Sequence, residues 1–443
     1  MSSEKSIKNK LNQKINLSVP RVSKKVFVGM SGGVDSSVTA MLLRDAGHDV
    51  TGVFINTWQP DYIECTSKDD RLDAMRVCAQ LDIKFLTLDL ESEYKKYVID
   101  YFLDEYKNNR TPNPDVMCNK YIKFGAFLDY ALQNGADYIA TGHYAKIENK
   151  TPPNPLFQKE GEYELFTSDD KNKDQSYFLY QIKKENLSKI LFPLASLEKS
   201  EVRKIAKDNN LCTSDKKDSQ GICMLGGDVS VKDFLIKELK PEKGDVCIRK
   251  NNENQNTPNP SFKKRGEYQL EKIGTHNGVI LYTIGERHGF EIDNSKNKEP
   301  DQNNTPYFVI GKDLENNILI VSQNKPTQSN NKNDLDFNNN NKILLSEVNI
   351  LIDRENKNNK EIFDSPVFAR SRYRGELFKI KFDMQESSFE ILERETKTPP
   401  APLSKRGEKN TEDVKIINTI CVSGQSLVMY DKNNRVLGGG VIA

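Results

Sequence analysis

The sequence predicts an α/β protein: a doubly wound parallel sheet, a small mixed middle domain and a C-terminal antiparallel β-barrel. From Lys25 to about Ile147, apolar strands alternate with helical segments, which is typical of a parallel sheet covered by helices on both faces. Beyond about residue 305 the pattern changes to short strands separated by turns, which favours a small barrel or sandwich. The 443 residues exceed one compact core, so two or three domains are expected.

The N-terminal elements follow from apolar runs and helical periodicity. Strands are predicted at "KVFVGM" (25–30), "DVTGVFINTW" (49–58), "IKFLTLDL" (83–90) and "ADYIATGH" (136–143). Helices are predicted at 36–46, 69–81, 91–107, 119–134 and 199–211. Ligands are expected at the carboxyl ends of these strands, because the loops of such a sheet gather there.

The C-terminal elements are short strands. They are predicted at "PYFVIGKD" (306–313), "NILIVSQ" (317–323), "KILLSEVNI" (342–350), "LFKIKFD" (377–383), "SFEILER" (388–394), "QSLVMYD" (425–431) and "VLGGGVIA" (436–443). The expected organisation is a disordered basic tail over 1–24, an α/β domain over 25–225, a middle domain over 226–304 and a barrel domain over 305–443.

Three near copies of one Pro-rich, charged segment interrupt the chain. They are "TPPNPLFQKEGE" (151–162), "TPNPSFKKRGE" (257–267) and "TPPAPLSKRGE" (398–408). They are too short and polar to be structural repeats, so we expect surface inserts within 149–162, 249–268 and 396–412. Asn-rich tracts at 293–304 and 329–342 look equally dispensable. The alternative is ordinary linker composition without a common origin.

Composition excludes several classes of protein. Sixty-five basic and 64 acidic side chains give a net charge of +1, so a globally basic nucleic-acid binder is not indicated, although local basic patches remain open. No apolar run is long enough for a membrane span, and the Lys-rich start lacks the apolar segment of a secretory signal. The seven cysteines form no C-x-x-C pair, which makes a zinc site improbable and suggests free thiols in a reducing compartment.

A Gly-rich turn between the first strand and the first helix predicts a phosphate site. Ser31-Gly32-Gly33-Val34-Asp35-Ser36 aims backbone N–H groups at one point, and its serines add hydroxyl donors. Asp35 could hold Mg²⁺. The motif resembles the pyrophosphate loop of the N-type ATP pyrophosphatases, which cut ATP between its α- and β-phosphates. The alternative is a tight strand-to-helix turn without a ligand.

Two cysteines in polar, turn-like settings suggest sulfur chemistry near that loop. Cys118 lies just ahead of a predicted helix, three residues after Asp115, where the helix dipole lowers a thiol's pKa. Cys223 lies in "KKDSQGICML" (216–225), a Gly- and Lys-bearing loop after a basic helix. For each cysteine alone, a buried core thiol is the alternative.

Taken together, these motifs resemble those of the bacterial tRNA-specific 2-thiouridylases. The resemblance covers nearly the whole chain from about residue 25. It is carried by "GMSGGVDSSV", "RTPNPDVMCNKYIKF", "ADYIATGHYAKI", "NKDQSYFLY", "LFPLASLEKSEVRKIA", "KKDSQGICML", "YTIGERHG", "ENNILIVSQ", "RSRYRG" and "LGGGVI". The family's "PGQS" reads "SGQS" at 423–426, with little expected consequence.

The resemblance implies an adenine-nucleotide α-hydrolase-like fold and roles for particular residues. Residues implied to bind ATP are Gly29, Met30, Ser31, Gly32, Gly33, Val34, Asp35, Ser36, Ile55 and Gly142. Residues implied to contact tRNA are Asn113, Pro114, Asp115, Lys173, Asp174, Gln175, Arg372 and Tyr373. The implied catalytic residues are Cys118, Cys223 and Asp115. Further cations suggested for RNA contact are Lys120, Lys123, Lys199, Arg203, Lys204, Lys207, Lys216, Lys217, Arg370 and Arg374.

The implied reaction is ATP- and Mg²⁺-dependent 2-thiolation of the wobble uridine of tRNAs for Glu, Gln and Lys. A Cys223 persulfide would deliver sulfur and Cys118 would resolve it. A cysteine desulfurase or sulfur-relay protein would donate the persulfide, and a cytoplasmic monomer is expected. Three alternatives stay open: a pyrophosphatase-loop ligase acting on a small molecule, a non-enzymatic RNA-binding or sulfur-carrier protein, and an iron–sulfur-dependent tRNA thiolase.

Overall fold

The computed structural model describes residues 22–62, 67–150, 162–217, 230–249, 270–293, 306–323, 342–352, 362–363, 365–394 and 422–443. Three cysteines, Cys65, Cys223 and Cys421, lie outside these residues. So do most of the N-terminal tail, the three Pro-rich segments, the Asn-rich tracts and the expected domain boundary at 225.

The N-terminal sheet is parallel, in the order β3-β2-β1-β4-β7. Its strands are β1 (Lys25–Met30), β2 (Asp49–Asn56), β3 (Lys84–Asp89), β4 (Tyr138–Ala140) and β7 (Ile190–Leu191). Successive side chains of β1 enter different apolar clusters: Val26 and Val28 belong to one and Phe27 to the other. Because side chains alternate across a strand, both faces of the sheet are buried, which confirms the doubly wound prediction.

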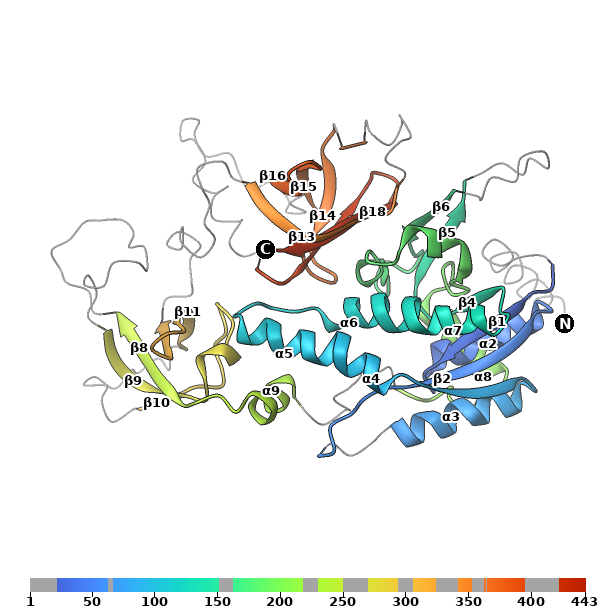
Figure 1. Ribbon diagram of the computed structural model, residues 1–443, viewed down its shortest axis with the longest axis horizontal. Coiled ribbons are helices and arrows are strands. Elements are labelled where there is room, and N and C mark those ends of the chain that lie inside the picture. The colour runs from blue at the N-terminus through green and yellow to red at the C-terminus, as the bar shows by residue number, and fades with distance from the viewer. Residues whose placement is uncertain are drawn as a thin grey trace.

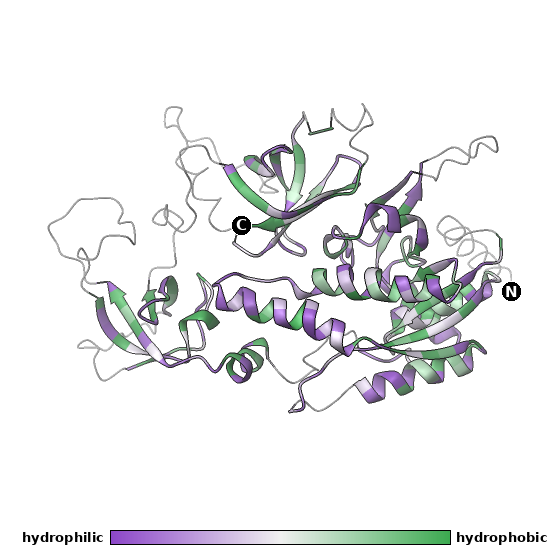
Figure 2. Ribbon diagram, viewed as in Figure 1, coloured by the Kyte–Doolittle hydropathy of each residue, from purple (hydrophilic) through white to green (hydrophobic). Residues whose placement is uncertain are grey.

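Helices cover both faces of this sheet (Figure 1). One face carries α2 (Val34–Asp45), α3 (Ser67–Gln80) and α8 (Lys199–Asp208). The other carries α4 (Glu91–Tyr94), η1 (Lys95–Ile99), α5 (Asp100–Lys107), α6 (Pro114–Met117), η2 (Cys118–Ala126) and α7 (Phe127–Gln133). Apolar residues of these helices and of the strands form the two clusters, and Figure 2 shows the hydrophobic colour of the sheet strands.

One helix begins earlier than the sequence predicts. The helix expected from 119 starts at Pro114, because Asn113 caps it: Asn113 Oδ1 accepts a hydrogen bond from Val116 N at 3.3 Å. Proline suits the first helical position, where its missing N–H costs nothing. Cys118 therefore lies one turn inside the helix, not ahead of it.

A hairpin and two short helical turns connect the sheet to later elements. They are β5 (Ala145–Asn149), β6 (Tyr163–Thr167), η3 (Ser176–Phe178) and η4 (Lys184–Lys189). The sequence did not predict this hairpin, because the first Pro-rich segment separates its strands.

The middle part is a second five-stranded sheet in the order β10-β9-β8-β12-β11. Its elements are α9 (Val231–Leu239), β8 (Gly244–Arg249), β9 (Leu270–His276), η6 (Val279–Leu281), β10 (Glu291–Ile292), β11 (Phe308–Asp313) and β12 (Ile318–Ser322). The boundary expected at 304/305 is not where the strands divide, since β12 pairs in parallel with β8. The change of composition that suggested the boundary comes from the inserted tract at 293–304. The strands before and after this tract pair in one sheet, so they belong to the same domain.

The C-terminal barrel is closed, in the order β13-β16-β15-β14-β17-β18. Its strands are β13 (Lys342–Ile350), β14 (Val367–Arg370), β15 (Phe378–Asp383), β16 (Ser388–Arg394), β17 (Ser426–Tyr430) and β18 (Val436–Ile442). This confirms the predicted antiparallel barrel. Figure 1 shows the barrel above the helix that α6 begins. Among the described residues, no helix has the length and apolar character needed to cross a membrane.

Candidate active site

The Gly-rich loop joins β1 to α2, and its shape requires glycine. Gly32 has a φ of +70°, and a Cβ at this residue would lie 2.3 Å from the carbonyl oxygen of Asp70. Gly33 is the N-cap of α2 and offers no side chain to the first N–H groups of the helix. These N–H groups lie at the positive end of the helix dipole, so the loop forms an anion site.

Hydroxyl groups hold the loop in shape. Ser31 N donates to Ser36 Oγ at 3.2 Å, and Ser36 Oγ donates to the Gly33 carbonyl at 3.2 Å. Ser37 Oγ donates to the same carbonyl at 2.8 Å and accepts from Thr213 Oγ1 at 3.0 Å. The loop is therefore preorganised by the protein itself, which lowers the cost of binding a phosphate.

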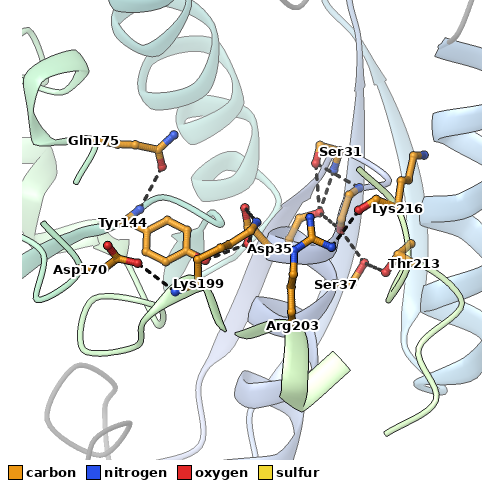
Figure 3. A network of polar contacts seen from close by, with 12 residues as sticks. Ser31, Asp35, Ser37, Tyr144, Asp170, Gln175, Lys199, Arg203, Thr213 and Lys216 are labelled. Carbon is orange, nitrogen blue, oxygen red and sulfur yellow. Dashed lines mark hydrogen bonds and ion pairs between the residues drawn. The ribbon is translucent and has the colours of Figure 1, made fainter. Parts of the chain in front are cut away.

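The carboxylate of Asp35 is held by a lysine and a tyrosine. Lys199 Nζ lies 2.7 Å from both carboxylate oxygens, and Tyr144 Oη donates to Oδ1 at 3.0 Å. The side chain of Lys199 is only 13% exposed. Figure 3 shows the three side chains converging at the start of α2. The first residue of α8 thus supplies the cation that the loop sequence itself lacks.

A loop over residues 168–176 positions both partners of Asp35. Asp170 Oδ2 accepts from Lys199 N at 2.9 Å, which fixes the start of α8. Gln175 Oε1 accepts from Tyr144 N at 3.1 Å, and Gln175 N donates to the Tyr144 carbonyl at 2.8 Å. Three of the residues implied to contact tRNA, Lys173, Asp174 and Gln175, therefore belong to a loop that also supports the nucleotide site.

Asp174 is a buried member of the same loop. Its carboxylate accepts from Ser168 N at 3.1 Å, Ser176 N at 3.3 Å and Ser176 Oγ at 2.9 Å. Burial raises the pKa of this carboxyl, and the hydrogen bonds from the two serines oppose the rise. The Asp174 side chain is thus bonded within the protein, and its implied contact with tRNA stays a prediction.

Two further lysines suggested for RNA contact have carboxylate partners instead. Lys216 Nζ lies 2.6 Å from Asp70 Oδ1 and 2.7 Å from Asp73 Oδ2. Lys120 Nζ lies 2.8 Å from Glu347 Oε2. The sequence does not reveal these pairs because each lysine is remote from its partner along the chain. Lys216 and Lys217 lead directly into the undescribed segment that contains Cys223.

The residues implied to line the adenosine pocket lie beside the loop. A Cβ at Gly142 would come within 2.9 Å of backbone and side-chain atoms of Asp35, so only glycine allows this close approach. Ile55 is half-buried near the carboxyl end of β2, and Gly29 and Met30 end β1. The parallel register pairs Met30 with Phe54, the neighbour of Ile55. The predicted nucleotide residues therefore share one edge of the sheet.

Asp115 and Cys118 lie on consecutive turns of one helix. Asp115 is in its first turn, and Cys118 is buried with 8% exposure at the start of the π-helical stretch η2. Asp115 keeps exposed surface. Desolvation nevertheless raises the pKa of its carboxyl, and Lys123 opposes the rise. A carboxyl with a raised pKa beside a thiol is suited to proton transfer.

His143 is a structural neighbour of this helix. Its Nδ1 lies 2.7 Å from Thr141 Oγ1, and its ring lies against Phe124 and Phe192. Burial, aided by Lys123, holds the pKa of His143 well below its usual range, so the ring is neutral near pH 7. His143 therefore packs as a neutral side chain among aromatic rings.

The segments implied to contact tRNA meet around Tyr177. Its hydroxyl lies 2.9 Å from the Ser371 carbonyl, and the carbonyl of the next residue, Phe178, accepts from Asn119 Nδ2 at 3.1 Å. The ring of Tyr373 lies 4.7 Å from that of Phe178. Three segments far apart in the sequence, 113–115, 173–175 and 372–373, are thus brought to one side of the α/β domain.

An anion loop at the carboxyl edge of a parallel sheet places the chain in the class of nucleotide-binding α/β proteins. Residues 24–227 match the family model described as tRNA methyl transferase HUP domain, and residues 263–323 match that described as tRNA methyl transferase PRC-barrel domain. The tRNA-specific 2-thiouridylase MnmA of Staphylococcus carnosus is 46% identical over 302 residues, covering 68% of this chain and 72% of that protein. The one from Streptococcus thermophilus is 38% identical over 420 residues, covering 94% and 95%.

The chain therefore belongs to the tRNA-specific 2-thiouridylase family, a family of sulfurtransferases. Among solved structures, the U34-tRNA thiolase NcsA from Methanococcus maripaludis covers 53% of this chain and 74% of that one, at 18% identity and a TM-score of 0.33. The NMN synthetase from Francisella tularensis covers 48% and 75%, at 19% identity and a TM-score of 0.29. These two structural likenesses are too weak to support an argument about the site.

Proposed function

We propose that this enzyme replaces the C2 oxygen of the wobble uridine in tRNA by sulfur, using ATP. The observation that supports this most strongly is that one α/β domain contains both a preformed phosphate loop and the Asp115–Cys118 helix. The first can hold an activating nucleotide, and the second offers a thiol beside an acid. The relatives are tRNA-specific 2-thiouridylases, and an ATP-dependent thiolation would use both parts.

In the first step, the uridine O2 attacks the α-phosphorus of ATP. An O–P bond forms, the α–β P–O bond breaks, and pyrophosphate leaves. The N–H groups at the start of α2 and the ammonium group of Lys199 stabilise the departing charge. Asp35 has the chemistry to hold Mg²⁺ together with phosphate oxygens, and the ion would neutralise phosphate charge. When ATP binds, the Lys199 ammonium group would leave the Asp35 carboxylate and contact a phosphate oxygen instead.

In the second step, sulfur replaces the activated oxygen. A donor protein first loads Cys223 as a persulfide. The Cys118 thiolate attacks the Cys223 Sγ, which releases hydrosulfide and leaves a Cys118–Cys223 disulfide. Hydrosulfide attacks C2, AMP leaves with the oxygen, and a cellular dithiol reduces the disulfide for the next cycle. In the variant, the outer persulfide sulfur attacks C2 directly and AMP leaves. Cys118 then attacks the Cys223 Sγ, which frees the 2-thiouridine and forms the same Cys118–Cys223 disulfide.

The target base must leave the anticodon stack to reach this site, and a loop permits that at modest cost. Tyr373 offers an aromatic face for stacking, and Arg372 and Lys173 offer cations for phosphates. Asp115, with its raised pKa, would move the proton that accompanies the attack.

The test is nucleoside mass spectrometry of unmodified tRNA-Glu incubated with the enzyme, ATP, Mg²⁺ and a persulfide donor. We expect 2-thiouridine with the wild type and none with Cys118→Ser or Cys223→Ser. Cys212→Ser is the matched control, because Cys212 is an exposed thiol outside the site, and it should keep full activity. Thiolation by either site variant would refute the role of that cysteine. ATP cleavage without tRNA would favour a small-molecule ligase.

A further inference from the structure

The barrel contacts the chain just before the Asp115–Cys118 helix. The carbonyl of Ser423 accepts a hydrogen bond from Thr111 N at 2.9 Å. Ser423 begins the turn 423–426 that leads into β17, which we call the barrel turn. Thr111 lies in the loop 110–113, which ends at the helix cap Asn113. The two contacting segments are thus about three hundred residues apart in a chain of 443.

Gly424 lets the main chain of the barrel turn lie directly against the main chain of the loop 110–113. Its φ is +86°, and a Cβ at this residue would lie 2.7 Å from Thr111 N, 2.8 Å from Arg110 Cβ and 2.9 Å from the Thr111 carbonyl oxygen. Any side chain here would therefore meet main-chain atoms of the loop. Backbone cannot yield as the end of a flexible side chain does, so a substitution must displace the loop or the turn.

The barrel turn itself is rigid. Gly424 N donates to the Ile442 carbonyl at 2.8 Å, and Ile442 N donates to the Gln425 carbonyl at 2.8 Å. Gln425 N donates to the Val422 carbonyl at 3.0 Å, and Ser426 is 1% exposed. These bonds fasten the turn to the end of β18. The turn therefore acts as a fixed surface against which the loop is placed.

Tyr177 fastens the barrel turn from the other side. Its hydroxyl lies 2.9 Å from the carbonyl oxygens of both Ser426 and Ser371, and the residue is 3% exposed. Tyr180 Oη adds a bond to Ser426 Oγ at 3.1 Å. The carbonyl of the next residue, Phe178, accepts a hydrogen bond from Asn119 Nδ2 at 3.1 Å, so the Tyr177 segment joins the barrel to the helix that contains Cys118.

The loop between these contacts is held at both ends. Arg110 Nε donates to Glu105 Oε2 at 2.8 Å, and its second guanidinium contact is to Glu105 Oε1. Asn113 caps α6 at the other end. Only Thr111 and Pro112 remain between these anchors, and Thr111 is bonded to the barrel turn. The bond from Thr111 to Ser423 thus ties the segment that leads into α6, and with it Asp115 and Cys118, to the barrel.

We propose that the barrel turn and Tyr177 position Asp115 and Cys118 for sulfur transfer, so that the C-terminal barrel is a working part of the catalytic site. Gly424 and Tyr177 are positioning residues, since neither has to touch tRNA or ATP. The inference rests on the proposed roles of Asp115 and Cys118. Gly424 lies against Arg110, Thr111 and Ile442, away from the nucleotide loop, so we expect a change at Gly424 to leave ATP affinity largely unaltered.

The test compares Gly424→Ala with Gly135→Ala. Gly135 has a similar φ of +76°, but a Cβ there would meet only Lys25 Nζ at 3.8 Å, so it controls for backbone strain alone. We expect Gly424→Ala to lower kcat for thiolation about 10- to 100-fold, because a 1 Å misplacement can cost that much. The Kd for ATP should stay within about twofold of the wild-type value. Ser423→Ala keeps the bonding carbonyl and should keep the rate.

A second readout reports the position of Cys118 directly. Alkylation of Cys118 by iodoacetamide, followed by peptide mass spectrometry, should be faster in Gly424→Ala than in Gly135→Ala, because the buried thiol becomes more accessible. Tyr177→Phe removes only the hydroxyl and should show the same changes to a smaller extent. Tyr177→Phe provides the same test if the Gly424→Ala protein does not fold.

The outcomes separate two failures. Wild-type kcat and wild-type Cys118 alkylation in folded Gly424→Ala, or in Tyr177→Phe if Gly424→Ala does not fold, would overturn the inference and leave the proposed function intact. Normal thiolation by Cys118→Ser and Asp115→Asn would instead remove the proposed roles on which the inference rests. Equal losses of kcat and ATP affinity in Gly424→Ala would also overturn it, since they indicate general damage.

Discussion

The two ends of the candidate site are built in different ways. The phosphate end is a continuous strand-turn-helix over 29–37, held by bonds between neighbours such as Ser31 and Ser36. The sulfur and tRNA end is assembled from the 110–118 segment, the loop around Tyr177 and two turns of the barrel. Local chemistry thus shapes the phosphate turn, to which Lys199 and Tyr144 add a remote cation and donor from the same domain. Positioning a thiol against a large substrate, in contrast, requires contacts between domains.

The largest effect should come from breaking the phosphate end at Gly32. Gly32→Ala forces an L side chain into φ +70° and against the Asp70 carbonyl, so we expect at least a ~100-fold loss in kcat/KM for ATP. Gly47→Ala is the control, because Gly47 has φ +87° with open space around it and tests strain without collision. Pyrophosphate release with tRNA is the measurement. Equal behaviour of the two variants would show that the loop tolerates a displaced backbone.

The next effect separates charge from hydrogen bonding at Asp35. Lys199→Gln removes the ammonium group next to the phosphates, and we expect a ~100-fold lower rate of pyrophosphate release. Tyr144→Phe removes one neutral donor and should cost only about fivefold. Similar losses in both variants would contradict a phosphate role for Lys199 and leave it as a support of Asp35.

A pH profile sharpens the comparison at the sulfur end. If Asp115 acts as a base, its active form is the carboxylate, so kcat falls as the pH drops through its pKa. Desolvation raises that pKa, and the acid limb should therefore lie above the usual carboxyl value of 3.8. The measurement is the rate of thiolation as a function of pH. Asp115→Glu retains a carboxyl group and should therefore retain the fall in rate at acid pH. An unchanged limb in Asp115→Asn would assign it to another group.

The smallest effect concerns the docking of the barrel. Asn349 Nδ2 donates to the carbonyls of Tyr180 and Ile182 at 2.7 and 2.8 Å. Asn349→Ala leaves both acceptors without this donor, so we expect about 1–3 kcal/mol of lost stability, measured as a lower denaturation midpoint. Asn316→Ala removes an amide in an exposed turn and should change stability by less than about 0.5 kcal/mol. Equal midpoints would mean that the barrel docks without Asn349.

The sequence alone determined much of this protein. Periodicity predicted most strands and helices of the α/β domain and the barrel, but missed the short strands β7 and β14. The Gly-rich turn located the anion site, because such a turn is a local structure. The family resemblance placed Asp115, Cys118 and the tRNA segments along the chain. Where prediction failed locally, as at the start of the helix at Pro114, the cap Asn113 had been overlooked.

Only the tertiary structure decided which residues act together. Lys199 was expected on an RNA-binding face, but its ammonium group contacts Asp35, 164 residues away. Lys120 and Lys216 likewise form ion pairs with carboxylates. The tertiary structure also joined β12 to β8 across an inserted tract and brought Gly424 against Thr111. The physical reason is that periodicity and turn chemistry record short-range preferences, whereas the partner of a charge or a backbone group depends on how remote segments are brought together in space.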